Sequence, residues 1–171
     1  MLDYSSPTES FLRELFMVKI LFVCHGNICR SPMAEFIMKK MVLDEGIADD
    51  FFIESAATST EELGNSVHYG TKGVLKKYGI DCSKKRARQI NKADYGEFDI
   101  IVGMDGYNLR NMNRIFGGDP LNKISLLLDH TGEYRDVADP WYTGNFDATE
   151  NDVVNGCRAL LEILRNRKNL K

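Results

Sequence analysis

The chain has 171 residues, 43% of them hydrophobic, and a formal net charge of -3. This length and composition predict one globular domain with its own hydrophobic core. The mild negative charge argues against a nucleic-acid-binding surface, and no apolar stretch approaches the roughly 20 residues that span a bilayer.

Residues 1–16 precede a natural start at Met17, and we expect them to form a disordered or weakly ordered extension of a domain at residues 17–171. They lack the basic start and apolar core of a signal peptide. The four cysteines, at positions 24, 29, 82 and 157, do not show the paired spacing of a zinc site. We therefore expect a cytoplasmic protein with reduced thiols and no metal.

A buried strand is predicted at residues 18–23, where apolar side chains form a nearly continuous run. A short loop follows, and a helix is expected with Ser31 as its N-cap and Pro32 in the first helical position. The loop therefore lies over a helix N-terminus. The backbone N–H groups of residues 25–31 could surround a phosphate dianion there.

Cys24 and Arg30 stand at the two ends of this loop. A thiolate is the nucleophilic form of cysteine, and a helix N-terminus and a nearby guanidinium both favour that form. The guanidinium of Arg30 matches two phosphate oxygens, and the hydroxyl of Ser31 could donate to the thiolate. The Cys–Arg spacing alone has about a one in five chance in a chain with four cysteines. The strand before it and the helix after it make the pattern more specific.

The rest of the chain alternates between predicted strands and helices. Strands are expected at residues 51–53, 98–102 and 124–128, and helices at 67–78, 109–116 and 153–164, the last capped by Asp147 or Thr149. This order predicts an α/β fold, a single-domain open parallel sheet of about four strands with helices on both faces and the phosphate-binding loop after the first strand. The ligand then lies beyond the carboxyl ends of the strands.

Asp139 lies in a loop between the last predicted strand and the terminal helix. A phosphate dianion bound beside its carboxyl group would favour the protonated form, which could then donate to a leaving oxygen. The adjacent Trp141 and Tyr142 could form a wall for an aromatic leaving group, with ordinary packing as the alternative.

Five segments of this sequence together resemble the low-molecular-weight protein tyrosine phosphatases. The segment CHGNICRSPMAE at residues 24–35 resembles their active-site loop, and DPW at 139–141 resembles their general-acid motif. SAATS at 55–59, ARQI at 87–90 and MDGYNLR at 104–110 resemble further family landmarks. The similarity runs from about Val18 to Leu164.

The resemblance implies a two-step phosphoryl transfer without metal or cofactor. Cys24 would be the nucleophile, Arg30 would hold the phosphate, and Asp139 would be the general acid and then the base. The remaining implied site residues are the loop residues His25, Gly26, Asn27, Ile28, Cys29 and Ser31, the loop support Ser55, and the rim residues Glu61, Trp141 and Tyr142. Family members often carry histidine in the supporting network where this chain has Lys85.

The implied partners are a phosphotyrosine protein and inorganic phosphate or another oxyanion. We expect no nucleic acid or membrane partner, and a monomer or weak dimer. Cys29 resembles a resolving cysteine that protects Cys24 from oxidation, although a small packed side chain is an equal reading of the sequence alone.

Three alternatives remain open. A thioredoxin-coupled arsenate reductase of this fold needs two further cysteines close together, and only Cys82 lies in that region. A protein-arginine phosphatase has threonine where this chain has Ile28, whose apolar side chain suits an aromatic ring better. A non-catalytic phosphate-binding module would need neither a nucleophile nor an acid.

Overall fold

The computed structural model describes residues 7–169. Its strands are β1 (Val18–Cys24), β2 (Phe51–Ala57), β3 (Ile100–Gly103) and β4 (Ile124–Leu126). Its α-helices are α1 (Pro7–Phe16), α2 (Arg30–Asp44), α3 (Tyr69–Lys77), α4 (Lys92–Glu97), α5 (Gly106–Phe116), α6 (Pro140–Thr143) and α7 (Phe146–Asn169). Two 3-10 helices, η1 (Ala48–Asp50) and η2 (Leu127–Thr131), connect them.

The four strands form one parallel sheet in the order β2-β1-β3-β4. The chain leaves β1 toward β2 and later crosses back to β3 on the other side of β1. The carboxyl end of β1 is therefore the point where the strand order reverses, which is where open α/β sheets bind ligands. The predicted fold class and the predicted position of the loop agree with this arrangement.

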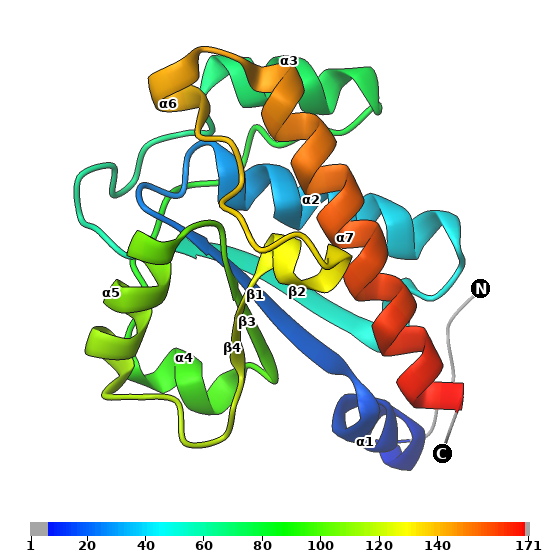
Figure 1. Ribbon diagram of the computed structural model, residues 1–171. Helices are drawn as coiled ribbons and strands as arrows, with labels where there is room; N and C mark the ends of the chain where they lie inside the picture. Colours follow the sequence, from blue (N-terminus) through cyan, green and yellow to red (C-terminus); the bar gives the residue numbers. More distant parts are fainter. Residues whose placement is uncertain (1–6, 170–171) are drawn as a thin grey trace.

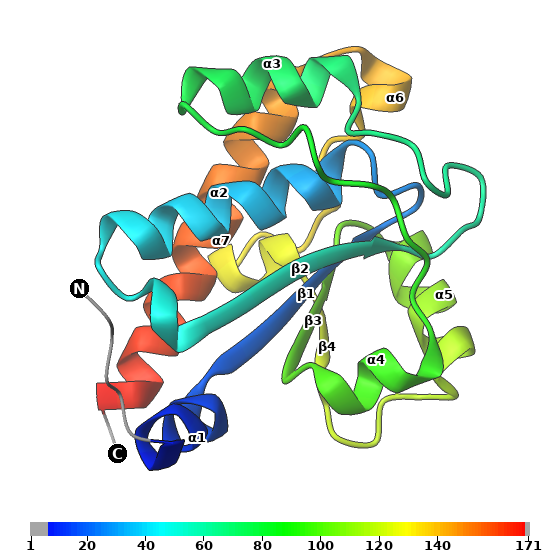
Figure 2. The same cartoon turned by 180° about the vertical axis from the view of Figure 1, so that it is seen from behind.

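Helices cover both faces of the sheet, with α2, α3 and α7 on one face and α4 and α5 on the other (Figures 1 and 2). Successive residues of β1 point to opposite faces, as the pleat of a strand requires. Ile20 and Phe22 belong to the larger core cluster under α2 and α7, whereas Leu21 and Val23 belong to the smaller cluster under α4 and α5. This explains why β1 is apolar apart from Lys19.

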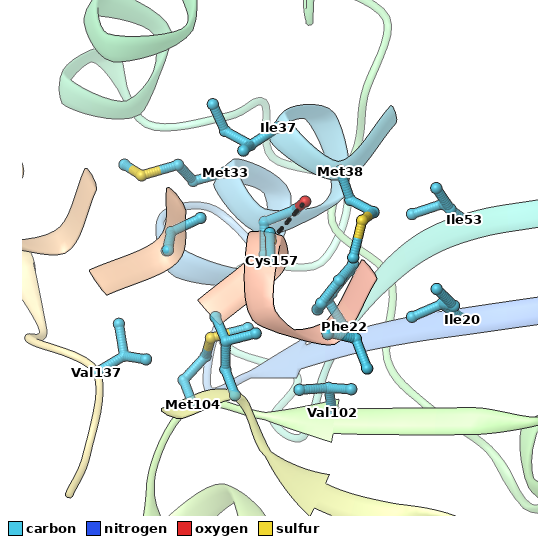
Figure 3. Packing of buried hydrophobic residues seen from close by; sticks show 14 of the residues in the cluster. Ile20, Phe22, Met33, Ile37, Met38, Ile53, Val102, Met104, Val137 and Cys157 are labelled. Atoms are coloured by element: carbon cyan, nitrogen blue, oxygen red, sulfur yellow. Dashed lines mark hydrogen bonds between the residues drawn. The ribbon is translucent and has the colours of Figure 1, made fainter. Parts of the chain in front are cut away.

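The larger core fixes helix α2 against both the sheet and α7. Figure 3 shows Met38 of α2 beside Phe22 of the sheet, and Met33 and Ile37 of α2 belong to the same core cluster. The thiol of Cys157 in α7 donates to the backbone oxygen of Ala34, with 3.7 Å between the atoms, so α7 lies directly against α2 (Figure 3). Because α2 follows the loop at the end of β1, this packing also holds the loop.

Several predicted boundaries are wrong by a few residues. Helix α2 begins at Arg30 with Cys29 as its N-cap, so Ser31 lies inside the first turn, and its hydroxyl bonds to other side chains. The last strand ends at Leu126, because residues 127–131 turn into η2. Helix α7 begins at Phe146, and the Asn145 side chain accepts from the backbone of the first turn in place of the predicted cap.

Within the extension expected at residues 1–16, residues 7–16 form helix α1, and residues 1–6 lie outside the described part of the chain. Helix α1 lies at the amino-terminal end of the sheet, far from the loop after β1 (Figures 1 and 2). Among the described residues, no helix is long and apolar enough to cross a membrane.

Candidate active site

The side chain of Asn27 stabilises the backbone conformation of the loop after β1 through hydrogen bonds. Asn27 has a positive φ of 58°, a conformation that asparagine adopts more readily than most residues, and it is 1% exposed. Its side-chain nitrogen donates to the hydroxyls of Ser31, at 2.9 Å, and Ser55, at 2.8 Å. Its side-chain oxygen accepts from the backbone N–H of Arg88 at 3.2 Å. One amide thus ties the loop to α2, to β2 and to the segment after α3.

The hydroxyl of Ser31 joins this amide to the thiol of Cys24. The oxygen of Ser31 lies 3.1 Å from the sulfur of Cys24, and both side chains are buried. Because the oxygen accepts from Asn27, the hydroxyl can donate to the sulfur or to the backbone oxygen of Ala56, which is farther away at 3.4 Å. The sulfur thus lies beside both a hydroxyl group and the N-terminus of α2.

Arg30 lies between two carboxylates that come from distant parts of the chain. Its Nη1 donates to Asp105 at 2.8 Å, and its Nη2 is 3.1 Å from Asp139. Burial alone would lower the pKa of Arg30, but the negative charges of Cys24, Asp139 and Asp105 outweigh it, so the pKa is raised. The guanidinium is therefore a permanent charge in a fixed orientation, facing the same pocket as the thiol of Cys24.

The two carboxylate oxygens of Asp139 have different partners. It is the N-cap of α6, and its Oδ1 accepts from the backbone N–H of Trp141 at 3.1 Å. Pro140 at the first helical position has the backbone angle that this start requires. The other carboxylate oxygen is the one that faces Arg30, so the cap aims it into the pocket.

A buried carboxylate, Glu35, supports Ser55 beneath the loop. Glu35 is 2% exposed and accepts from the Ser55 hydroxyl, and its other bonds are to Lys85 and Lys39, each at 2.7 Å. The ammonium of Lys85 also donates to the backbone oxygen of Ser55 at 3.0 Å. Lys85 therefore bonds directly to the network that supports the loop.

These groups surround a pocket of about 640 Å³ at the carboxyl end of β1. The predicted site residues that line it are Cys24, His25, Gly26, Ile28, Cys29, Arg30, Glu61, Asp139, Trp141 and Tyr142. Asn27, Ser31 and Ser55 do not line it; each is at most 1% exposed and lies beneath it. Trp141 and Tyr142 of α6 line the pocket and are exposed, and Glu61, which also lines it, bonds to His25 at 3.0 Å. No group of side chains suited to a metal ion occurs among the residues described.

Cys29 lines the same pocket as Cys24, and both carry free thiols. Burial, assisted by the charge of Cys24, raises the pKa of the Cys29 thiol to about 12. Cys29 is thus a neutral thiol at neutral pH.

The predicted site residues omit Asp105 and Glu35, and also the pocket-lining residues Glu62, Tyr107, Asn108 and Asn111. Asp105 was part of a family landmark, but nothing showed that it would bind Arg30, because 75 residues separate them. Its position just before α5, as part of a capping box, was a detectable signal for the helix but not for the ion pair. Glu35 is the last residue of the loop motif, and the motif does not indicate that its carboxylate binds Ser55 and Lys85.

The geometry can be compared with known proteins. A sequence model of the family described as low molecular weight phosphotyrosine protein phosphatase matches residues 19–170. The chain belongs to this family. The low-molecular-weight protein-tyrosine-phosphatase YfkJ of Bacillus subtilis is 36% identical over 90% of this chain and 100% of its own length.

The chain is also similar to phosphatases of this family from distant organisms. The low molecular weight phosphotyrosine protein phosphatase of Homo sapiens is 39% identical over 84% of this chain and 93% of its own. The crystal structure of YfkJ superimposes with a TM-score of 0.85 over 89% of this chain and 97% of that one. A Drosophila arginine phosphatase superimposes with a TM-score of 0.77 at 30% identity, covering 86% of this chain and 98% of that one. The predicted family, fold class and hydrolase class are confirmed, and the low-molecular-weight phosphatase family implies phosphoprotein substrates and phosphate binding.

Proposed function

We propose that this phosphatase hydrolyses phosphotyrosine in proteins, and small aryl phosphates, through a phosphocysteine intermediate. The observation that carries the proposal is the convergence of a thiol, a guanidinium and a carboxyl group on one pocket: Cys24, Arg30 and Asp139 all line it. In the proposed domain division, residues 17–171 form the phosphatase domain and residues 1–16 an extension.

In the first step, the sulfur of Cys24 attacks phosphorus and an S–P bond forms. The P–O bond to the substrate breaks in line with it, and Asp139 gives its proton to the departing phenolate oxygen. Arg30 and the backbone N–H groups of the loop bind the equatorial oxygens, where charge is spread in the transition state. His25, Gly26, Ile28 and Cys29 contribute to this loop.

In the second step, the carboxylate of Asp139 takes a proton from water, whose oxygen attacks phosphorus. The S–P bond breaks, Cys24 leaves as a thiolate, and phosphate is released. The Ser31 hydroxyl donates a hydrogen bond to the departing sulfur and keeps its proton, which makes the sulfur a better leaving group. Asn27 and Ser55 keep Ser31 and the loop in position.

The walls of the pocket favour an aromatic substrate. Trp141 and Tyr142 provide exposed aromatic surface on one side, and Ile28 provides apolar surface next to the loop. A protein-arginine phosphatase is the second candidate, favoured by the similarity to the Drosophila protein of that name. It is the weaker one, because the described pocket places an isoleucine where a guanidinium would need a polar group.

The other two alternatives have less support. Cys82 does not line the pocket, and burial raises the pKa of its thiol, so a disulfide cascade of an arsenate reductase has no second cysteine beside Cys29. A phosphate-binding module would not require the carboxyl of Asp139 beside the thiol.

The proposal includes a cytoplasmic location and a monomer or weak dimer that binds neither nucleic acid nor membranes. The support for the location is that all four cysteines are free thiols, as expected in a reducing compartment. The net charge of -3 supports the absence of nucleic acid.

Hydrolysis of matched phosphotyrosine, phosphoserine and phosphoarginine peptides, with a metal chelator present, tests the proposal. We expect phosphotyrosine to be hydrolysed with the highest kcat/KM and the chelator to have no effect. Cys24→Ser should abolish turnover while retaining vanadate binding, because the hydroxyl is a poor nucleophile and the loop remains. Equal rates on all three peptides, or substantial activity in Cys24→Ser, would contradict it.

A further inference from the structure

A second hollow of about 300 Å³ adjoins the active-site pocket. Three residues, His25, Glu61 and Asn111, line both, so the hydrogen-bonded pair of His25 and Glu61 forms part of the boundary between the two. The rest of the second hollow is polar, and its lining includes Thr58, Gln89 and Arg114. The proposed mechanism uses none of these three side chains.

The exposed face of α5 connects the active site with this hollow. Tyr107, Asn111 and Arg114 are four and three residues apart, so they lie on one face of the helix. Tyr107 lines the active-site pocket, Asn111 lines both cavities, and Arg114 lines the second hollow. At 1.5 Å per residue, the face extends about 10 Å from Tyr107 to Arg114. An extended peptide covers this distance in about three residues.

Arg114 is the fixed positive charge of the second hollow. Its Nη2 donates to the side-chain oxygen of Asn111 at 3.1 Å, and it forms no ion pair with any carboxylate of the described residues. The one carboxylate in the hollow, that of Glu61, is bonded to His25. The guanidinium therefore retains donors for an anionic group that approaches from the active-site side.

The wall of this hollow also has unused hydrogen-bonding capacity. Thr58 is 5% exposed, and its hydroxyl is the one buried side-chain polar atom among the described residues without a hydrogen-bond partner. Buried polar groups normally have partners, and exceptions often mark sites where water or a ligand supplies one.

We propose that this hollow is a substrate subsite for an anionic group about two or three residues from the phosphotyrosine. The group is the carboxylate of an acidic residue or a second phosphate, and Arg114 binds it. The inference rests on the proposed function, since the phosphotyrosine must first occupy the loop. It adds a sequence preference that the catalytic residues do not provide.

The test measures kcat/KM for phosphotyrosine peptides that carry one Glu, Ala or Lys at each position near the phosphotyrosine. The wild type should prefer Glu over Ala by about 2–5-fold at one or two adjacent positions, as expected for an exposed charge pair, and added salt should reduce the preference. Arg114→Gln should remove the preference, and Arg114→Glu should shift it to Lys. A second phosphotyrosine at the same position, compared with Glu, shows which anion is bound more strongly.

Arg110→Gln is the matched control. Arg110 lies one turn earlier on α5, stacks on the ring of Tyr107 and lines neither cavity. This variant should keep the wild-type preference, and all variants should hydrolyse p-nitrophenyl phosphate at the wild-type rate, because this substrate does not reach the hollow. A preference for Glu that survives in Arg114→Gln, or equal kcat/KM for all peptides, would overturn the subsite. No hydrolysis of any phosphotyrosine peptide by the wild type would instead overturn the proposed function.

Discussion

The ammonium of Lys85 lies 2.7 Å from the carboxylate of Glu35, beneath the phosphate-binding loop. This ion pair determines the direction of a chain of hydrogen bonds. The carboxylate can only accept, so Ser55 donates to Glu35 and accepts from Asn27. The Asn27 amide donates to Ser31 as well, so the Ser31 hydroxyl can donate to Cys24, at 3.1 Å, or to the more distant backbone oxygen of Ala56, at 3.4 Å.

We expect Lys85→Met to destabilise the fold by about 3 kcal/mol, because it leaves a buried carboxylate with only Lys39 as a cation. It should also reduce kcat, since the hydrogen bonds above Glu35 lose their fixed direction. Thermal denaturation and kinetics on p-nitrophenyl phosphate measure the two effects. The exposed neighbour Lys84→Met is the control and should change neither. If the double variant Lys85→Met, Glu35→Gln is no more stable than Lys85→Met, the charge of Glu35 is not the cause.

Ser31→Ala should slow turnover by about 10–100-fold, the effect of losing a hydrogen bond to a charged sulfur. The rate of the second step should fall most, because the thiolate leaves in that step. Rapid-quench kinetics should therefore show phosphocysteine accumulating in the variant. A loss confined to the first step would mean that Ser31 acts on the attack of Cys24 instead.

Asp139→Ala should reduce kcat/KM for phosphotyrosine by about 10²–10⁴-fold, the usual range for general-acid catalysis. An aryl phosphate with an acidic leaving group should lose far less in the first step, because its phenolate departs without a proton. Initial rates over a series of leaving groups give the comparison. Equal losses in kcat/KM across the series would show that Asp139 does not act as the general acid.

The local part of the site was predictable, because β1, the loop and the first turn of α2 are contiguous in sequence. Residues 24–31 bring thiol, guanidinium and hydroxyl together without any long-range information. That Asp139 would lie beside this loop was implied by the family resemblance and not by the spacing of the residues. The contacts of Arg30 with Asp105 and of Lys85 with Glu35 were not predictable, because they depend on the order of strands in the sheet. The start of α2 was misplaced because Ser31 resembles an N-cap, whereas its hydroxyl bonds to Cys24 and Asn27.

Ile28→Thr should raise kcat/KM for phosphoarginine relative to phosphotyrosine. Ile28 packs against Cys29, Ala87 and Phe146 and lines the pocket, so threonine replaces apolar contact with a hydroxyl and additional space. A change of this size in an apolar pocket is worth about 1–3 kcal/mol, so we expect a shift in preference and not a switch. Ile28→Val makes space without adding a hydroxyl, so it separates the effect of the additional space from the effect of the hydroxyl. An unchanged ratio in Ile28→Thr would show that Ile28 does not set the choice.

The last prediction concerns oxidation of the thiol pair. Cys24 is expected to be oxidised first by peroxide, because a thiolate reacts faster than a thiol, and its sulfenic acid then condenses with the thiol of Cys29, releasing water. Reductant should restore the wild type, whereas Cys29→Ser should be inactivated at a similar rate and recover poorly. Burial raises the pKa of the Cys29 thiol to about 12, so only a small fraction of Cys29 is thiolate at neutral pH. This fraction grows as the pH rises. The fraction of wild-type enzyme that recovers should therefore increase between about pH 7 and 9. Mass spectrometry should find a bond between Cys24 and Cys29, and sulfinic or sulfonic acid at Cys24 alone would exclude the protective role.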